Sequence, residues 1–276
     1  MTSTMFLKKN MAKDLMAWAL AAAAMLAVSS LSAQTPALQL YAAGSLREAL
    51  TEVAQQFEAQ GGGKVALTFG ASGLLRERIE KGEPAQLFAS ADMDHPRHLA
   101  QGGAWQPPVM FARNQICALA APQVRATPAT LLDTLLDPAV RVGTSTPGAD
   151  PSGDYAWALF RRAEAVRPGA FAVLDAKALK LVGGADSVQP PAGRNVYAWL
   201  MEEGKADVFL TYCTGAVAVR REFPRMQLVD APPELQVSAS YGLSARTGDA
   251  AAGRLAQYIL SAPAQAVLRR HGFGQP

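Results

Sequence analysis

The sequence has few of the side chains on which most enzymes depend. Its 276 residues include two cysteines and three histidines, too few and too scattered for a metal-ligand cluster. The common phosphate-binding, dinucleotide-binding, zinc-protease and serine-hydrolase motifs do not occur. A Ser/His or Cys/His nucleophile pair therefore has little support. These shortages predict a protein that is not an enzyme and that holds neither a cofactor nor a resident metal.

Charge is also sparse. Charged residues make up 18% of the chain, and the formal net charge is +3. Residues 1–33 carry three lysines and one aspartate, a net +2, which leaves +1 for the rest. A nucleic-acid partner would require a clear basic excess, so none is expected. Half of the residues are hydrophobic, enough for a buried core, and the length suits two lobes of ordinary size.

The N-terminus has the pattern of an export signal. Lys8, Lys9 and Lys13 precede an apolar run over 15–28, and small residues follow up to Ala33. The run is shorter than the roughly 20 residues of a membrane-spanning helix. Residues 1–33 are therefore predicted to be a cleaved signal peptide, and the mature chain to be periplasmic.

The remaining cysteines, Cys117 and Cys213, lie in apolar runs typical of strands. The oxidising environment outside the cytoplasm permits a disulfide between them. Two buried free thiols fit the same runs equally well, and the sequence leaves both possibilities open.

Short apolar runs alternate with longer amphipathic stretches along the mature chain, which predicts an α/β fold. Strands are expected at 38–43, 64–69, 87–91, 115–121, 140–144, 206–212, 226–230 and 239–245. Helices are expected at 45–59, 72–81, 153–166, 195–203 and 249–269. This order favours mostly parallel sheets with helices on both faces.

A serine opens three of these helices, each time after a strand and small residues. Ser45 follows YAAG, Ser72 follows TFGA, and Ser152 follows GADP. Serine is a good helix N-cap, and capping alone would explain any one of them. Helix N-termini beyond the carboxyl ends of strands also present free N–H groups and a partial positive charge to an anion. Together the three starts predict a site for a small tetrahedral dianion, built from neutral donors.

In these motifs the sequence resembles the periplasmic molybdate-binding proteins of ABC importers. The resemblance covers nearly the whole mature chain and rests on YAAGSLREAL, TFGASGLLRERIEKGEPAQLFASAD, PSGDYAWALF, NVYAWLMEEGKADVFLTYCTGA and LSAPAQAVLRRHGF. It implies a two-lobed periplasmic-binding-protein fold of type II whose interlobe cleft closes on molybdate or tungstate. It also implies a monomer that delivers its ligand to an ABC transporter permease in the inner membrane. We expect lobe 1 over 34–114, lobe 2 over 115–230 and a return to lobe 1 over 231–276.

The same resemblance implies the site residues: Ser45, Ser72, Ser152, Val196 and Tyr212. The serines would give hydroxyl and backbone donors, Val196 a backbone donor, and Tyr212 its hydroxyl. The helix after Asn195 is shorter than the family pattern, so Arg194 and Asn195 compete with Val196 for that place.

Two carboxylates flank the expected second-lobe contact. Asp150 and Asp154 either point to solvent or cap the helix, or they enter the site and change its selectivity. Sulfate, another oxyanion or a small organic anion is therefore the alternative ligand. The sequence does not rank molybdate against tungstate, because the two anions have nearly the same size and charge.

Overall fold

The computed structural model describes residues 36–276, apart from the side chain of Val217. The expected signal peptide, 1–33, lies outside the described residues. Residues 37–276 form one compact unit. Among the described helices, none has the length and apolar character needed to cross a bilayer.

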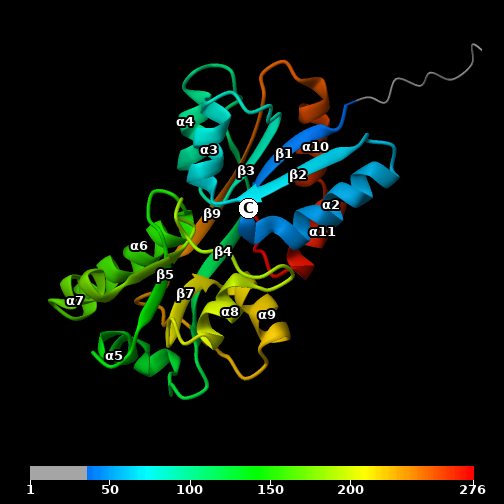
Figure 1. Ribbon diagram of the computed structural model, residues 1–276. Coiled ribbons are helices and arrows are strands. Elements are labelled where there is room, and N and C mark those ends of the chain that lie inside the picture. Colours follow the sequence, from blue (N-terminus) through cyan, green and yellow to red (C-terminus); the bar gives the residue numbers. More distant parts are fainter. Residues whose placement is uncertain (1–35) are drawn as a thin grey trace, which may run out of the picture. The chain divides into compact units, whose positions relative to one another are not determined.

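Two sheets build this unit (Figure 1). Sheet I has the strand order β2 (Val65–Gly70), β1 (Leu38–Ala43), β3 (Leu87–Ser90), β9 (Ser238–Ala245), β4 (Val109–Ala120). Sheet II continues from β4 through β7 (Val208–Tyr212), β5 (Val142–Ser145) and β6 (Leu179–Val182), with β8 (Gln227–Asp230) on the other side of β4.

Strand β4 belongs to both sheets. Its residues up to Gln115 pair with β9, and those from Ile116 onward pair with β7. Every antiparallel pairing of the described strands involves β4 or β9, whereas β1–β2, β1–β3, β5–β6 and β5–β7 are parallel. The predicted α/β fold is confirmed, with the antiparallel pairs where the chain passes between the sheets.

Helices cover both faces of sheet I, because successive strand residues point to opposite faces. Leu40 and Ala42 pack into the core that includes α2, α10 and α11, while Tyr41 between them packs with residues of α3 and α4. The helices on this sheet are η1 (Gly44–Leu46), α2 (Arg47–Ala59), α3 (Ser72–Glu80), α4 (Asp94–Ala100), α10 (Ala250–Leu260) and α11 (Ala262–Arg270).

Sheet II repeats this arrangement. Val208 and Leu210 share a core with α5, α6 and α7, while Phe209 packs with α8 and α9. The helices here are η2 (Pro128–Thr130), α5 (Leu131–Leu136), α6 (Pro151–Val166), α7 (Ala170–Lys177), α8 (Val196–Glu202) and α9 (Cys213–Glu222). Each fully buried Leu or Phe contributes about 1.5–3 kcal/mol to stability.

The eight expected strands are all present, and β6 is an additional one. The helix expected over 249–269 is two helices: α10 ends before Ser261, and α11 begins at Ala262 with Pro263 in its first turn, where proline is tolerated. Cys117 on β4 and Cys213 at the start of α9 form a disulfide, which resolves the alternative that the sequence left open.

Candidate functional site

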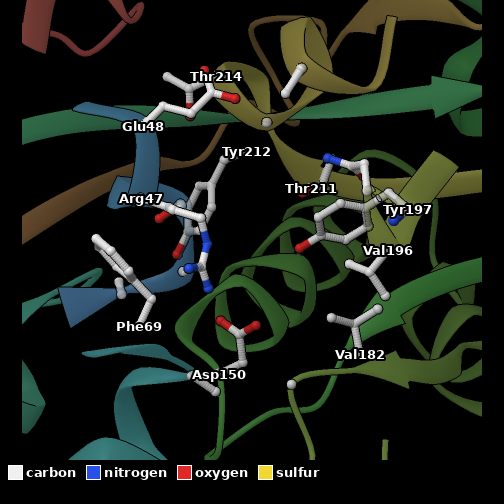
Figure 2. A pocket seen from close by; sticks show the side chains of 18 of the residues that line it. Arg47, Glu48, Phe69, Asp150, Val182, Val196, Tyr197, Thr211, Tyr212 and Thr214 are labelled. Carbon is white, nitrogen blue, oxygen red and sulfur yellow. Dashed lines mark hydrogen bonds between the residues drawn. The ribbon is translucent and has the colours of Figure 1, made fainter. Parts of the chain in front are cut away.

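A cavity of about 1120 Å³ lies at the carboxyl ends of the parallel strands from both sheets. Sheet I contributes the residues after β1 and β2, and sheet II contributes those after β6 and β7 together with the start of α8. Open α/β sheets bind ligands at such strand ends. We refer to this space as the central cavity. Figure 2 shows the Arg47 guanidinium, the Asp150 carboxylate and the Tyr197 and Tyr212 rings around it.

Ser45 lines the central cavity but does not cap a helix. The chain enters α2 through the 3₁₀ turn η1, whose N-cap is Ala43, so Ser45 falls inside the turn. Its hydroxyl lies 3.0 Å from the hydroxyl of Tyr241 on β9. The expectation that Ser45 is a cap is therefore wrong, because the helical turn begins one residue earlier, at Gly44.

Ser72 is fully buried and is not among the residues that line the central cavity. The N-cap of α3 is Ala71, and the Ser72 hydroxyl accepts a hydrogen bond from Ala91 N–H (3.1 Å) after β3. This bond ties the start of α3 to the end of β3. The expectation that Ser72 is the N-cap is therefore also wrong, because the cap position belongs to Ala71, one residue earlier.

Ser152 is also buried and does not line the central cavity. Asp150 is the N-cap of α6, and its carboxylate accepts from Ser152 N–H at 3.1 Å. The Ser152 hydroxyl has no hydrogen-bond partner among the described residues. The cap is therefore the aspartate, in agreement with one of the two alternatives for Asp150.

Asp150 lines the central cavity as well. Burial raises the pKa of its carboxyl to about 6, and the nearby Asp154 and Asp92 add to the shift, against the hydrogen bond from Ser152 N–H. It lies against Gly183, where an added Cβ would be 2.5 Å from Asp150 Cβ. An ionised carboxylate here places negative charge at the edge of the site.

Tyr212 ends β7 and faces the central cavity. Its side chain is 3% exposed, and its hydroxyl has no hydrogen-bond partner among the described residues. Its ring lies 5.6 Å from that of Tyr241 and 6.3 Å from that of Tyr155. Burial raises the pKa of Tyr212 well above its ordinary value and that of Tyr197 to about 12. Both hydroxyls therefore keep their protons at neutral pH and act as donors.

Val196, Asn195 and Arg194 all line the central cavity. Asn195 caps α8 by accepting from Tyr197 N–H (3.0 Å) and Ala198 N–H (3.3 Å), so Val196 is the first residue of the helix. Arg194 is paired with Glu202 and Glu222. Two carboxylates thus offset the Arg194 charge, which makes it a poor candidate for an anion clamp.

Sequence reasoning missed several polar residues of the lining, among them Arg47 and Thr214. Arg47 packs its guanidinium over the ring of Phe69, with 4.6 Å from Cζ to the ring centre, and Figure 2 shows it directed into the pocket. Thr214 accepts a hydrogen bond from Asn114 (2.8 Å). Each lies two positions after a predicted site residue, and this proximity was the only feature of the sequence that could have pointed to them.

The described residues offer one cluster of potential metal ligands: Cys117, Cys213 and Asp230. The two sulfurs form the disulfide, so neither is a thiolate ligand. The central cavity is instead lined by hydroxyl and amide donors and by charged side chains. Among these, Arg194 pairs with Glu222 and Arg221 with Glu48, whereas Asp150 and Arg47 have no ion-pair partner among the described residues.

Comparisons with known proteins identify the family and the fold. A family model described as bacterial extracellular solute-binding protein matches residues 38–274. The uncharacterized protein PM1146 of Pasteurella multocida (strain Pm70) is 39% identical over 218 residues, 77% of this chain and 88% of that protein.

Two solved structures share the fold. The periplasmic molybdate-binding protein of Azotobacter vinelandii superposes with a TM-score of 0.67 at 19% identity, over 87% of this chain and 99% of that chain. PEB3, a Campylobacter jejuni protein solved with bound L-phospholactate, superposes with a TM-score of 0.67 at 16% identity, over 87% of this chain and 100% of that chain. The predicted type II periplasmic-binding-protein fold is confirmed.

Proposed function

The chain belongs to the bacterial extracellular solute-binding protein family, and from this premise we propose that its central cavity captures a small oxyanion for an ABC importer. Molybdate or tungstate is the leading ligand. The family is one of binding proteins, so no bond chemistry is proposed. The signal peptide over 1–33 would export the chain to the periplasm, where it would work as a monomer with an inner-membrane permease.

One observation carries the anion assignment: the Tyr212 hydroxyl is buried at the cavity wall and has no partner among the described residues. A buried hydroxyl without a partner loses about 1–3 kcal/mol, so a ligand that accepts its hydrogen gains that amount. Ser45 supplies a second hydroxyl in the same lining. Neutral hydrogen-bond donors that are already positioned in the cavity offset the cost of desolvating an anion.

The proposed ligand contacts are the Ser45 and Tyr212 hydroxyls and the backbone N–H of Val196. Ser72 and Ser152 enter the proposal through the family resemblance alone, since both lie behind the cavity wall. The proposed lobes, 34–114 with 231–276 and 115–230, would be joined by β4 and by the segment between β8 and β9. A hinge there would let each lobe bring its own donors to the ligand.

The size of the central cavity favours a second candidate ligand, a small organic anion. About 1120 Å³ exceeds the usual range for drug-sized ligands, roughly 300–1,000 Å³, and is far larger than four oxygens around one metal need. Arg47 adds a guanidinium suited to a carboxylate or phosphate. PEB3, with its bound phospholactate, has the same fold.

Thermal-shift and calorimetric titrations with molybdate, tungstate, sulfate, phosphate and phospholactate separate these ligands. The proposal expects molybdate and tungstate to raise the melting temperature most, and Tyr212→Phe to reduce the affinity about 5- to 100-fold. Tyr258→Phe is the matched control, because its hydroxyl makes an exposed hydrogen bond with Gln60 and does not line the cavity. If phospholactate alone binds, the organic-anion candidate replaces the oxyanion. If no anion binds, the proposed function is wrong.

A further inference from the structure

Asn114 is a buried amide on β4 whose orientation is fixed by the backbone. Its Oδ1 accepts from Gln115 N–H at 2.9 Å, so the Nδ2 group must point the other way. There it donates to Thr214 Oγ1 at 2.8 Å and to the Tyr241 hydroxyl at 3.3 Å. One side chain thus supplies a hydrogen to two hydroxyls that belong to different sheets.

This arrangement sets the direction of the hydroxyl hydrogens. An amide nitrogen has two hydrogens, and these two bonds use both. Tyr241 Oη accepts from Asn114 and has one hydrogen of its own to donate. Its hydrogen-bond acceptor among the described residues is Ser45 Oγ, 3.0 Å away. The buried Tyr241 hydrogen has an acceptor only if Tyr241 donates to Ser45, and this arrangement leaves the Ser45 hydrogen available for a ligand.

Thr214 is in a similar position. Its oxygen accepts from Asn114, and its own hydrogen has no acceptor among the described residues. Ser45 and Thr214 both line the central cavity, Ser45 from η1 beside sheet I and Thr214 from α9 beside sheet II. The amide of Asn114 therefore turns both hydroxyls into hydrogen donors toward the cavity, one from each sheet.

We propose that Thr214 is a further anion-binding residue, and that Asn114 and Tyr241 are positioning residues that direct the Thr214 and Ser45 hydroxyls toward the ligand. This inference rests on the proposed function, since donors directed inward select an anion. It gives the site a built-in preference: a ligand that presents acceptors at these two points binds, and one that presents N–H or O–H groups there does not.

Calorimetry on the full mature chain tests the role of Thr214. The ligand is whichever of the five anions named above binds wild type most tightly. Thr214→Val keeps the shape and removes the hydroxyl, and the expected loss of affinity is about 5- to 100-fold. Thr214→Ser should recover most of that loss, because the hydroxyl returns. Unfolding curves confirm that each variant is folded. Wild-type affinity in Thr214→Val overturns the assignment of Thr214.

A double-mutant cycle tests the positioning arm. Tyr241→Phe should weaken binding about 3- to 10-fold in the wild-type background and have no further effect in Ser45→Ala, because it acts through that hydroxyl. A purely structural role of Tyr241 would cost the same in both backgrounds, and that result overturns the inference. If wild type binds no anion of the panel, the proposed function fails and takes this inference with it. If wild type binds and the variants match it, the inference alone fails.

Discussion

The backbone N–H of Gly73 donates to the carbonyl oxygen of Ala149 at 2.8 Å. This bond joins the first turn of α3, beside sheet I, to the loop that precedes α6, beside sheet II. The approach is so close that a Cβ on Gly73 would lie 2.4 Å from Gly148 O and 2.7 Å from Ala149 O. Only glycine fits there, and the contact closes one side of the space between the two sheets.

Gly73→Ala is expected to push these two segments apart. The obstacles are backbone oxygens, so the loop itself must move, and we expect a loss of about 1–3 kcal/mol in unfolding free energy and weaker ligand binding. Urea unfolding and calorimetry measure the two effects. Gly253→Ala in α10 is the control, because nothing lies within 4 Å of the added Cβ and alanine favours a helix. An unchanged Gly73→Ala protein would mean that the contact is absent in solution.

Ser45 and Ser72 are expected to differ, although both follow a strand and small residues. Ser45→Ala removes a cavity-lining hydroxyl, so affinity should fall about 5- to 100-fold. Stability should fall as well, because the buried Tyr241 hydroxyl loses its acceptor. Ser72→Ala leaves the Ala91 N–H without its partner, so stability should fall by about 1–3 kcal/mol and affinity little. Calorimetry and urea unfolding on both variants separate the two. An equal loss of affinity in Ser72→Ala would place its hydroxyl on the ligand instead.

Local pattern was sufficient for the strands and for most of the α/β fold, whereas the site residues stay a prediction. Short apolar runs between longer amphipathic stretches predicted eight strands. Strand β6 was not predicted, because LKLV is exposed or half-buried along its whole length and directly follows a helix. The helix starts were placed within one or two residues, but that small error removed the capping role from all three serines.

The polar network around the site could not be predicted from one sequence, because it depends on long-range contacts. Asn114 reaches Thr214 and Tyr241 across 100 and 127 positions. Nothing near Asn114 in the sequence indicates either partner. The disulfide is a similar case: two cysteines in an exported chain permit it, but only the pairing of β4 with β7 brings Cys117 close to the start of α9.

The disulfide is expected to stabilise the fold and the site together. It closes a loop of 96 positions, and loops of that size give typical stabilisations of about 2–4 kcal/mol. Because Cys213 lies between Tyr212 and Thr214, its loss should also weaken ligand binding. Urea unfolding of wild type with and without reductant measures the effect, and the Cys117→Ala/Cys213→Ala double variant should be indifferent to reductant. An unfolding midpoint that reductant does not move would contradict this expectation.

Asp150 is expected to make both stability and anion binding depend on pH. Burial raises the pKa of its carboxyl to about 6 in the folded state, against about 3.9 in an unfolded chain. The folded state thus holds the proton more tightly. This stabilising contribution is complete below about pH 4, declines as the pH rises toward 6, and is gone above it.

Asp150→Asn tests this directly, because asparagine is an equally good N-cap without the charge. Above pH 6 the variant should be more stable than wild type by about 1–3 kcal/mol, since one pKa unit corresponds to about 1.4 kcal/mol. It should also bind the anion more tightly at pH 7.5, because the ionised carboxylate repels it. Wild-type affinity should rise from pH 7.5 to 5.5, and the variant's should not. Asp94→Asn, at an exposed position on α4, is the control. If Asp150→Asn weakens binding at both pH values, the carboxylate contacts the ligand directly, and a ligand that donates a hydrogen to it replaces the bare oxyanion.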